Sequence, residues 1–249
     1  MSTIKSHSSS SKKVLPWAAL VIFILGGSII TAMYWQQNLR VKLVVVEGNY
    51  FTPTDDIIRV SKIDIGVHPD SIDLSNVILK VEELDYVHHA STYIDALGKL
   101  KISTRERFPI ALLVNGDNEV YVDAYGVKLP IIAGKQRNLP LVYGFDAKMN
   151  QDTLSGKEFN QVRDFLVSAL RNQFGWATIS EVAYDSYNGV VALSHENGVK
   201  LLFGLNDFDQ KLRNWEVFYS EVVAVKSIKT MQQVDLRFIN QVVTREVES

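Results

Sequence analysis

A long uncharged segment lies near the start of the chain, and shorter hydrophobic patterns follow it. From Val14 to Trp35 there is no Asp, Glu, Lys or Arg. At about 1.5 Å per residue, a helix over this segment reaches roughly 33 Å. A bilayer's hydrocarbon core needs about 30 Å. Trp17 at one end, with Tyr34 and Trp35 at the other, fits the aromatic residues found at membrane interfaces. The pattern predicts a transmembrane helix over residues 14–35.

A cleaved signal peptide is the alternative interpretation of this segment. Its apolar region usually spans about 7–15 residues and ends in small residues before the cleavage site. The run here is longer, and in Ile30-Thr31-Ala32 an isoleucine stands where a small residue is expected. A retained anchor is therefore the preferred interpretation.

The residues before this segment predict its orientation. Residues 1–13 contain three lysines, Lys5, Lys12 and Lys13, and no acidic residue. Because positive flanks stay in the cytoplasm, we expect residues 1–13 to form a cytoplasmic tail. The remaining chain is then expected on the outer side of the membrane.

Residues 36–109 alternate between strand and helix patterns. A β-branched run at 41–46 predicts a strand, and Thr54 followed by two aspartates predicts the start of a helix. Residues 73–84 place apolar side chains on one helical face. Two further strands are predicted at 87–94 and 100–107. The order strand, helix, helix, strand, strand predicts a small unit with helices against one sheet face.

Residues 110–240 contain shorter strands and tighter turns. Asn115-Gly116-Asp117-Asn118 is typical of a hairpin turn between strands at 111–114 and 119–124. The other predicted elements are a helix opened by the capping-box pattern Ser155-x-x-Glu158, strands at 179–187, 190–195 and 199–204, a helix at 207–222, and strands at 224–230 and 234–239. The predicted fold class is α+β: a mostly antiparallel β domain over 110–240 with helices packed on it, and a tail over 241–249.

Composition excludes several kinds of chemistry. The chain has no cysteine, so disulfides, thiol catalysis and cysteine-bound metals are absent. The formal net charge is −2, and no basic patch points to nucleic acid.

The histidines do not form a recognisable site. His88 and His89 are neighbours on a predicted strand and therefore point to opposite faces. His195-Glu196 begins like a zinc-binding helix motif, but Val199 stands where the second histidine belongs. We expect no catalytic residue, cofactor or metal ion.

Several short motifs in order resemble the FtsQ/DivIB family of bacterial cell-division proteins. They are Val44-x-Val46-x-Gly48-Asn49, Glu106-Arg107-x-Pro109-x-Ala111, Asp123-x-x-Gly126, Leu139-Pro140-Leu141-Val142-x-Gly144, Gly198-(x)5-Gly204 and Asp235-Leu236-Arg237-Phe238. The resemblance covers about residues 12–240. It implies a POTRA domain over 36–109, followed by the family's β domain.

The resemblance also implies a function. Members of the family are non-catalytic scaffolds in the cell membrane, concentrated at the division site, that help direct septal wall synthesis. They bind FtsB- or DivIC-type and FtsL-type proteins, and the POTRA domain is associated with recruitment and with other division proteins. FtsB-type binding is associated with the end of the β domain.

Strand addition is the physical form expected for that binding. Unpaired N–H and C=O groups at a sheet edge can complete a ladder with an extended partner segment. We expect residues 234–239 to be the last strand and the edge. Arg237 and Phe238 match the family's arginine–aromatic pair, and with Asn240 they are the predicted partner-binding residues. In the alternative interpretation, Phe238 lies in the core and Arg237 is a solvated charge.

Two other classes of function compete with the scaffold. A membrane-anchored cell-wall hydrolase, or another envelope enzyme, would need a cleft holding perturbed carboxylates or a histidine. A POTRA-bearing secretion or assembly factor would usually continue into a membrane β-barrel, for which this chain ends too soon.

Overall fold

The computed structural model describes residues 14–149, 153–238 and 241–246. The chain forms two compact units. The first comprises the residues up to Asn49, Pro53–Glu83 and His89–Thr104. The second comprises Tyr50–Thr52, Leu84–His88 and the residues from Arg105 onward. The expected boundary between residues 109 and 110 stays a prediction.

Helix α1 runs from Val14 to Asn38, three residues beyond the predicted span. Within the described residues, one helix is long and apolar enough to cross a membrane. The most apolar part of this helix is not buried against other parts of the described chain. Its apolar side chains, such as Phe23 at 80% exposure, therefore need a nonaqueous environment.

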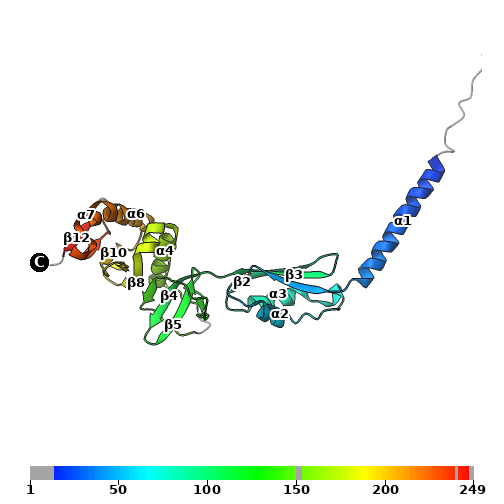
Figure 1. The fold of residues 1–249 in the computed structure, drawn as a ribbon, viewed down its shortest axis with the longest axis horizontal. Helices are drawn as coiled ribbons and strands as arrows, with labels where there is room; N and C mark the ends of the chain where they lie inside the picture. Colours follow the sequence, from blue (N-terminus) through cyan, green and yellow to red (C-terminus); the bar gives the residue numbers. More distant parts are fainter. Residues whose placement is uncertain (1–13, 150–152, 239–240, 247–249) are drawn as a thin grey trace, which may run out of the picture. The chain divides into compact units, whose positions relative to one another are not determined.

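The first unit contains the predicted order strand, helix, helix, strand, strand (Figure 1). Its sheet has the order β1-β3-β2, in which β1 and β3 are parallel. The strands are β1 Leu43–Glu47, β2 Val87–Ile94 and β3 Lys99–Glu106, and the helices are α2 Thr54–Ser61 and α3 Leu74–Glu82, with a 3₁₀ turn at Pro69–Ser71. Helix α3 begins where the Asp73 side chain accepts a hydrogen bond from the backbone N–H of Asn76, 3.0 Å away.

The second unit is built on one mixed sheet. In the described residues it has nine strands in the order β12-β11-β10-β9-β8-β7-β4-β5-β6. These are β4 Pro109–Asn115, β5 Asn118–Asp123, β6 Lys128–Leu129, β7 Leu141–Tyr143, β8 Ile179–Asp185, β9 Gly189–Ser194, β10 Lys200–Gly204, β11 Met231–Asp235 and β12 Val243–Glu246. Strand β7 is parallel to both neighbours, and β10 is parallel to β11; the other pairs are antiparallel. The predicted mostly antiparallel β domain is confirmed.

Helices pack on this sheet and complete its main core. They are α4 Lys157–Arg171, α5 Gln173–Thr178 and α6 Phe208–Phe218; a π-helical segment at Tyr219–Val223, α7 Ala224–Lys226 and a 3₁₀ turn at Ile228–Thr230 follow α6. Helix α4 lies on β8, β9 and β4, and α6 lies beside α4 (Figure 1). Phe165 of α4 is fully buried between Phe203 of β10 and Phe208 of α6, with ring centroids 4.6 and 5.5 Å apart.

A second hydrophobic cluster lies on the opposite face of β5. Tyr121 of that strand packs with Phe51, Tyr86 and Leu129, whereas its neighbours Val120 and Val122 belong to the main core. The Phe51 and Tyr86 rings stack with centroids 4.3 Å apart. Burying both faces explains why β5 lacks a regular polar alternation.

Two local predictions are wrong. Ser155 does not cap α4: the N-cap is Gly156 at φ 105°, with no side-chain hydrogen bond. This positive φ favours glycine over a residue with a Cβ. Residues 224–230 do not form a strand, because the helical path from α6 continues through Lys226 before Ser227 adopts a positive φ of 70°.

Removing the ring at the centre of the main core tests this packing. Phe165→Ala should lower the free energy of unfolding by about 3–5 kcal/mol, since it leaves a cavity between α4, α6 and β10. Chemical denaturation of the full chain in detergent measures this change. Leu170→Ala, on the same helix but 41% exposed, should cost no more than about 1 kcal/mol. Equal losses for the two variants would contradict the assignment of the core.

Candidate protein-interaction site

The accessible edge of the large sheet is β12. Strand β11 lies between β10 and β12, with Val234 opposite Leu201 on one side and Thr244 on the other. Strand β12 has a neighbour on one side only within the described residues, and all four of its residues are exposed. The expectation that residues 234–239 form the last strand and the edge is therefore wrong. So is the expectation that residues 241–246 belong only to a tail, since Val243–Glu246 form β12.

The Asp235 side chain explains where β11 ends. Its Oδ1 accepts the backbone N–H of Arg237 at 3.1 Å, which closes a local turn. Just before this turn, the Leu236 N–H still donates to the Leu202 carbonyl, 2.9 Å away. The chain leaves the ladder after this bond and returns antiparallel as β12.

The Arg237 side chain is 35% exposed and is fixed by hydrogen bonds within the protein. Its Nε lies 2.9 Å from Asp235 Oδ1, and its Nη2 lies 2.5 Å from Asp235 Oδ2. Its Nη1 donates to Asn188 Oδ1 at 2.9 Å. By bonding both Asp235 and Asn188, the guanidinium joins the end of β11 to the turn before β9. These contacts give Arg237 a structural role, and its predicted grip on a partner's carboxylate stays a prediction.

The turn that receives Arg237 is itself fixed by a carboxylate. Asp185 Oδ1 accepts the backbone N–H groups of Tyr187 and Asn188 at 3.0 and 2.7 Å. Those two hydrogen bonds, with the stronger one from Asn188, lower the pKa of Asp185. Asp185, Asn188, Arg237 and Asp235 thus form a continuous polar network across the ends of β8, β9 and β11.

The charges in this network alter one another. Burial raises the pKa of Asp235, but hydrogen bonds from the Arg237 side chain and backbone outweigh burial, and the net pKa is lowered. Nearby Lys211 is also buried, and its Nζ donates to the Asn206 carbonyl at 2.7 Å. Burial lowers the pKa of Lys211. At neutral pH, Asp235 is ionised and bonded to a permanent cation.

Phe238 follows this network and is 44% exposed, so it does not belong to the core. Two other exposed apolar side chains are on adjoining segments: Tyr187 precedes Asn188, which bonds Arg237, and Leu205 follows Gly204. The Arg237 side chain passes close to Gly204: a Cβ atom at position 204 would lie 3.2 Å from Arg237 Cγ. Tyr187, Leu205 and Phe238 are named the apolar patch below. Asn240, the third predicted binding residue, lies outside the described residues.

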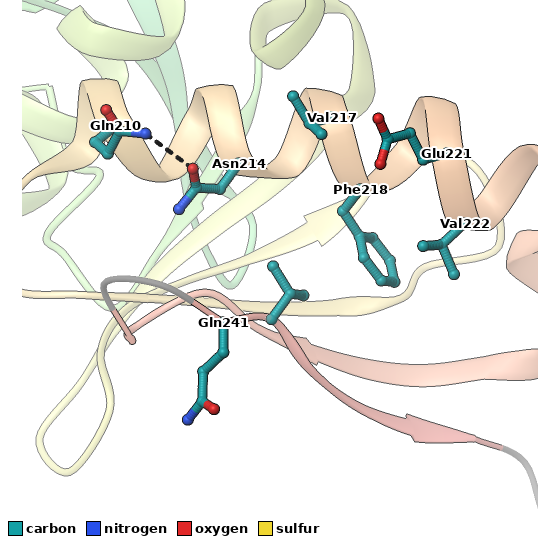
Figure 2. Close-up of a pocket in the computed structure, with 8 residues that line it drawn as sticks. Gln210, Asn214, Val217, Phe218, Glu221, Val222 and Gln241 are labelled. Atoms are coloured by element: carbon teal, nitrogen blue, oxygen red, sulfur yellow. Dashed lines mark hydrogen bonds between the residues drawn. The ribbon is translucent and has the colours of Figure 1, made fainter.

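A groove lies beside β12, between α6 with its π-helical extension and the segment that leads into β12. Its volume is about 450 Å³. Figure 2 shows Phe218 and Val222 extending from the helix toward the segment that carries Gln241. Gln210 Nε2 donates to Asn214 Oδ1 at 2.9 Å along the rim. The groove thus offers an apolar floor and amide groups at its margin.

Helix α6 is positioned by its buried face. Phe208, Leu212, Trp215 and Phe218 recur at helical spacing and are buried. Trp215 Nε1 donates to Thr178 Oγ1 at 3.0 Å, which also fixes the rotation of the helix. Beyond it, Lys226 Nζ pairs with Glu246 Oε1 at 2.8 Å and connects α7 to β12.

The sequence motifs considered for catalysis lie apart from this edge. The ring of His88 stacks on Tyr125, and His89 Nδ1 lies 2.9 Å from Glu82 Oε1. Glu196 accepts a hydrogen bond from the Tyr219 hydroxyl. Across the residues that the structure describes, no three His, Cys, Asp or Glu side chains gather in a way that could hold a metal ion.

Sequence reasoning missed β12 and the groove. The signal for β12 was present as Val242, Val243 and Thr244, three β-branched residues in a row. These residues fall within the tail expected over 241–249. The groove had no sequence signal, because it joins residues 210–222 to residues 241–242.

Comparison with known proteins identifies the family. The family model described as "FtsQ/DivIB, C-terminal related" matches residues 108–245, more than half of the chain. The chain belongs to the FtsQ/DivIB family of cell-division proteins. The match extends to residue 245 and so includes the first three residues of β12.

Relatives in the FtsQ/DivIB family extend the similarity over most of the chain. A protein named "Cell division protein FtsQ" from Rhodothermus marinus (strain ATCC 43812 / DSM 4252 / R-10) is 26% identical over 222 residues, covering 86% of this chain and 81% of the relative. A protein of the same name from Salinibacter ruber (strain DSM 13855 / M31) is 24% identical, with coverage of 85% and 84%. Another from Geobacter sp. (strain M21) is 25% identical, with coverage of 95% and 92%.

One solved structure is also similar. It is the major extracytoplasmic domain of the cell-division protein DivIB from Geobacillus stearothermophilus, at 14% identity and a TM-score of 0.33. The match covers 48% of this chain and 97% of that domain. A likeness at this level carries no argument about the site.

The polar network predicts a specific dependence of stability on pH. The pKa of Asp235 in the folded state lies below its ordinary value of 3.8. Its ionised form therefore contributes stability that is fully present above that value and is lost as the pH falls through the folded-state pKa. Asp235→Asn should lower the free energy of unfolding by about 1–3 kcal/mol at pH 7 and reduce the loss on acidification.

Denaturation at a series of pH values checks both effects. Asp209→Asn is the matched control, because Asp209 is exposed and its distance from Arg171 is 3.4 Å. The control should change the free energy of unfolding at pH 7 by no more than about 0.5 kcal/mol. It should leave the dependence of that free energy on pH as it is in the unmodified chain. An unchanged acid dependence in Asp235→Asn would show that the network does not stabilise the end of β11.

Proposed function

We propose that this chain is a non-catalytic scaffold of the bacterial division machinery that binds an extended partner segment along β12. The observation that supports the proposal most is the exposed outer edge of β12. The groove lies beside the segment that leads into β12, and Phe238 of the apolar patch precedes that segment. The partners proposed are FtsB- or DivIC-type and FtsL-type division proteins.

Strand addition explains how such an edge binds. The outward backbone groups of β12 would pair with those of the partner and extend the sheet by one strand. The backbone bonds supply affinity with little dependence on sequence. Charged Arg245 and Glu246 on β12 discourage pairing between copies of the same edge, which leaves it available to a partner of suitable sequence.

Side chains around the edge would supply specificity. The groove has the volume to hold apolar side chains of the partner against Phe218 and Val222. Phe238 offers an exposed aromatic ring on the segment that precedes β12, and aromatic rings are frequent among residues that dominate binding energy. Arg237 supports this surface from within through Asp235 and Asn188.

The opposite edge of the large sheet is a poor alternative. Strand β6 has two residues, Lys128 and Leu129, and both are buried. Leu129 packs in the cluster with Phe51 and Tyr86. A strand this short and covered offers a partner few free backbone groups.

The membrane anchor and the first unit complete the proposed scaffold. Helix α1 would hold the chain in the bacterial inner membrane, with residues 1–13 in the cytoplasm and the C-terminal part outside. We propose that residues 36–109 act as a POTRA domain that recruits the chain to the division site and contacts other division proteins. Residues from 110 onward would then act as the β domain that helps direct septal wall synthesis.

A substitution of Phe238 tests whether this residue belongs to the proposed binding surface. Phe238→Lys should weaken capture of the FtsB-type partner by about tenfold or more, because it replaces a buriable ring with a charge. Pull-down titration with the full chain in detergent measures the capture, and the unfolding midpoint is recorded in parallel.

Tyr93→Lys is the matched control for this experiment. Tyr93 is likewise an exposed aromatic residue, at 55% exposure, but it lies on β2 of the first unit. Capture by the control should match that of the unmodified chain. Unchanged capture by a folded Phe238→Lys chain would remove Phe238 from the binding surface.

A further inference from the structure

A second cavity lies within the second unit, away from β12. It has a volume of about 370 Å³. Arg105, Phe108, Tyr125 and Leu170 contribute to its lining, together with His88 and Asp123. Its residues come from the start of β2, the end of β3 and the residues after it, the start of β4, the end of β5 and α4. Glu106 and Arg107 also line it, and none of these residues takes part in the site at β12.

The two carboxylates at this cavity are already satisfied. Glu106 accepts the backbone N–H groups of Tyr50, Phe51 and Thr52, each at 2.7 Å. Asp123 is buried and lies 3.0 Å from Arg107 Nη1, while its other oxygen accepts backbone N–H groups at residues 125 and 127. Their negative charge is therefore offset locally and would not strongly repel an anion.

Two guanidinium groups beside the cavity have no carboxylate partner within the described ranges. Arg105 is exposed and makes no ion pair there. The Arg137 guanidinium lies over the Phe108 ring, 4.6 Å from its centroid. The surface next to the cavity therefore carries two guanidinium groups that form no ion pair within the described residues. Arginine in such a position can bind a carboxylate through two hydrogen bonds.

The same cavity has an apolar rim. Phe108, Tyr125 and Leu170 are 45%, 67% and 41% exposed. His88 stacks on the Tyr125 ring, and its Nδ1 is buried without a hydrogen-bond partner in the described part of the chain. An unpaired buried ring nitrogen costs free energy that a ligand's polar group could recover. Arginine, tyrosine and phenylalanine together are typical of protein-binding surfaces.

We propose that this cavity binds an acidic, extended segment of another protein, with one apolar side chain inserted beside Phe108 and Tyr125. Acidic groups flanking that side chain would pair with Arg105 and Arg137. The charge pattern decides the class of ligand: two available guanidiniums suit a short acidic peptide, whereas nucleic acid binding requires many phosphate contacts. This surface would act independently of β12 and would give the chain a second docking site.

Binding of defined peptides to the full chain in detergent tests the proposal. The probe is a fluorescein-labelled Glu-Glu-Leu-Phe-Glu-Glu peptide, followed by fluorescence anisotropy. We expect saturable binding that weakens as salt is raised from about 0.05 M to about 0.5 M, since charge pairs at the surface are screened. The peptides Lys-Lys-Leu-Phe-Lys-Lys and Glu-Glu-Ser-Gly-Glu-Glu should each bind at least about tenfold more weakly.

Variants assign the binding to the cavity. Arg105→Glu and Tyr125→Ser should each weaken binding of the acidic peptide by about tenfold or more. Both side chains are exposed, so the variants should remain folded. Arg213→Glu makes the same charge change on the exposed face of α6, and Phe238→Lys alters the β12 surface; both should bind the peptide within about twofold of the unmodified chain.

Each contrary outcome overturns the proposal. Binding that is unchanged in Arg105→Glu, or equal for the acidic and basic peptides, removes the charge complementarity. Binding that is lost in Phe238→Lys but kept in Tyr125→Ser assigns the peptide to the β12 surface. Absence of saturable binding shows that the cavity does not take an acidic segment. None of these results bears on capture of the FtsB-type partner at β12.

Discussion

The bidentate pair between Asp235 and Arg237 determines how the second unit ends. Asp235 is buried, so its carboxylate is stable only while hydrogen bonds offset the loss of water. Arg237 supplies those bonds from its backbone and its guanidinium and extends them to Asn188. The same bonds close the turn that takes the chain out of β11. Only after this turn can the chain return as β12. The position of the sheet edge therefore depends on an interaction between two side chains that are two positions apart in the sequence.

This arrangement separates the residues that build the binding surface from those that would contact a partner. The Arg237 guanidinium is engaged by Asp235 and Asn188, whereas Phe238, the outer edge of β12 and the groove along α6 remain exposed. Lys226 and Glu246 hold β12 against the end of the helical segment. The surface therefore combines a rigid backbone edge with apolar side chains on fixed elements. Such preorganisation reduces the entropy that a partner's binding must overcome.

Periodicity was sufficient to predict most elements, because their cores follow simple spacing. The helix containing Phe159, Val162 and Leu166 and the strands of the first unit were expected at nearly the observed residues. The errors arose where distant contacts override local preference. The expected strand at 224–230 contains the β-branched Val225, Ile228 and Thr230, but the helical path from α6 continues through Lys226; β12 is short and charged but gains a ladder from β11. The family motif predicts Phe238 as a candidate, whereas the groove beside β12 joins residues 210–222 to residues 241–242, which no local pattern reveals.

A pair of proline substitutions in β12 separates binding through the strand's backbone from binding through side chains alone. Thr244 pairs with Val234 and Arg245 pairs with Gln233, and adjacent residues of an antiparallel strand direct their N–H groups to opposite sides. Proline removes that N–H. One of the two variants, Thr244→Pro or Arg245→Pro, therefore loses a hydrogen bond to β11. The other loses only an N–H group that points away from β11, toward the proposed partner strand. Capture of the FtsB-type partner and the unfolding midpoint should be measured for both in the full chain. The variant that keeps its unfolding midpoint should lose capture by about tenfold or more. Full capture by that folded variant would contradict strand addition at β12.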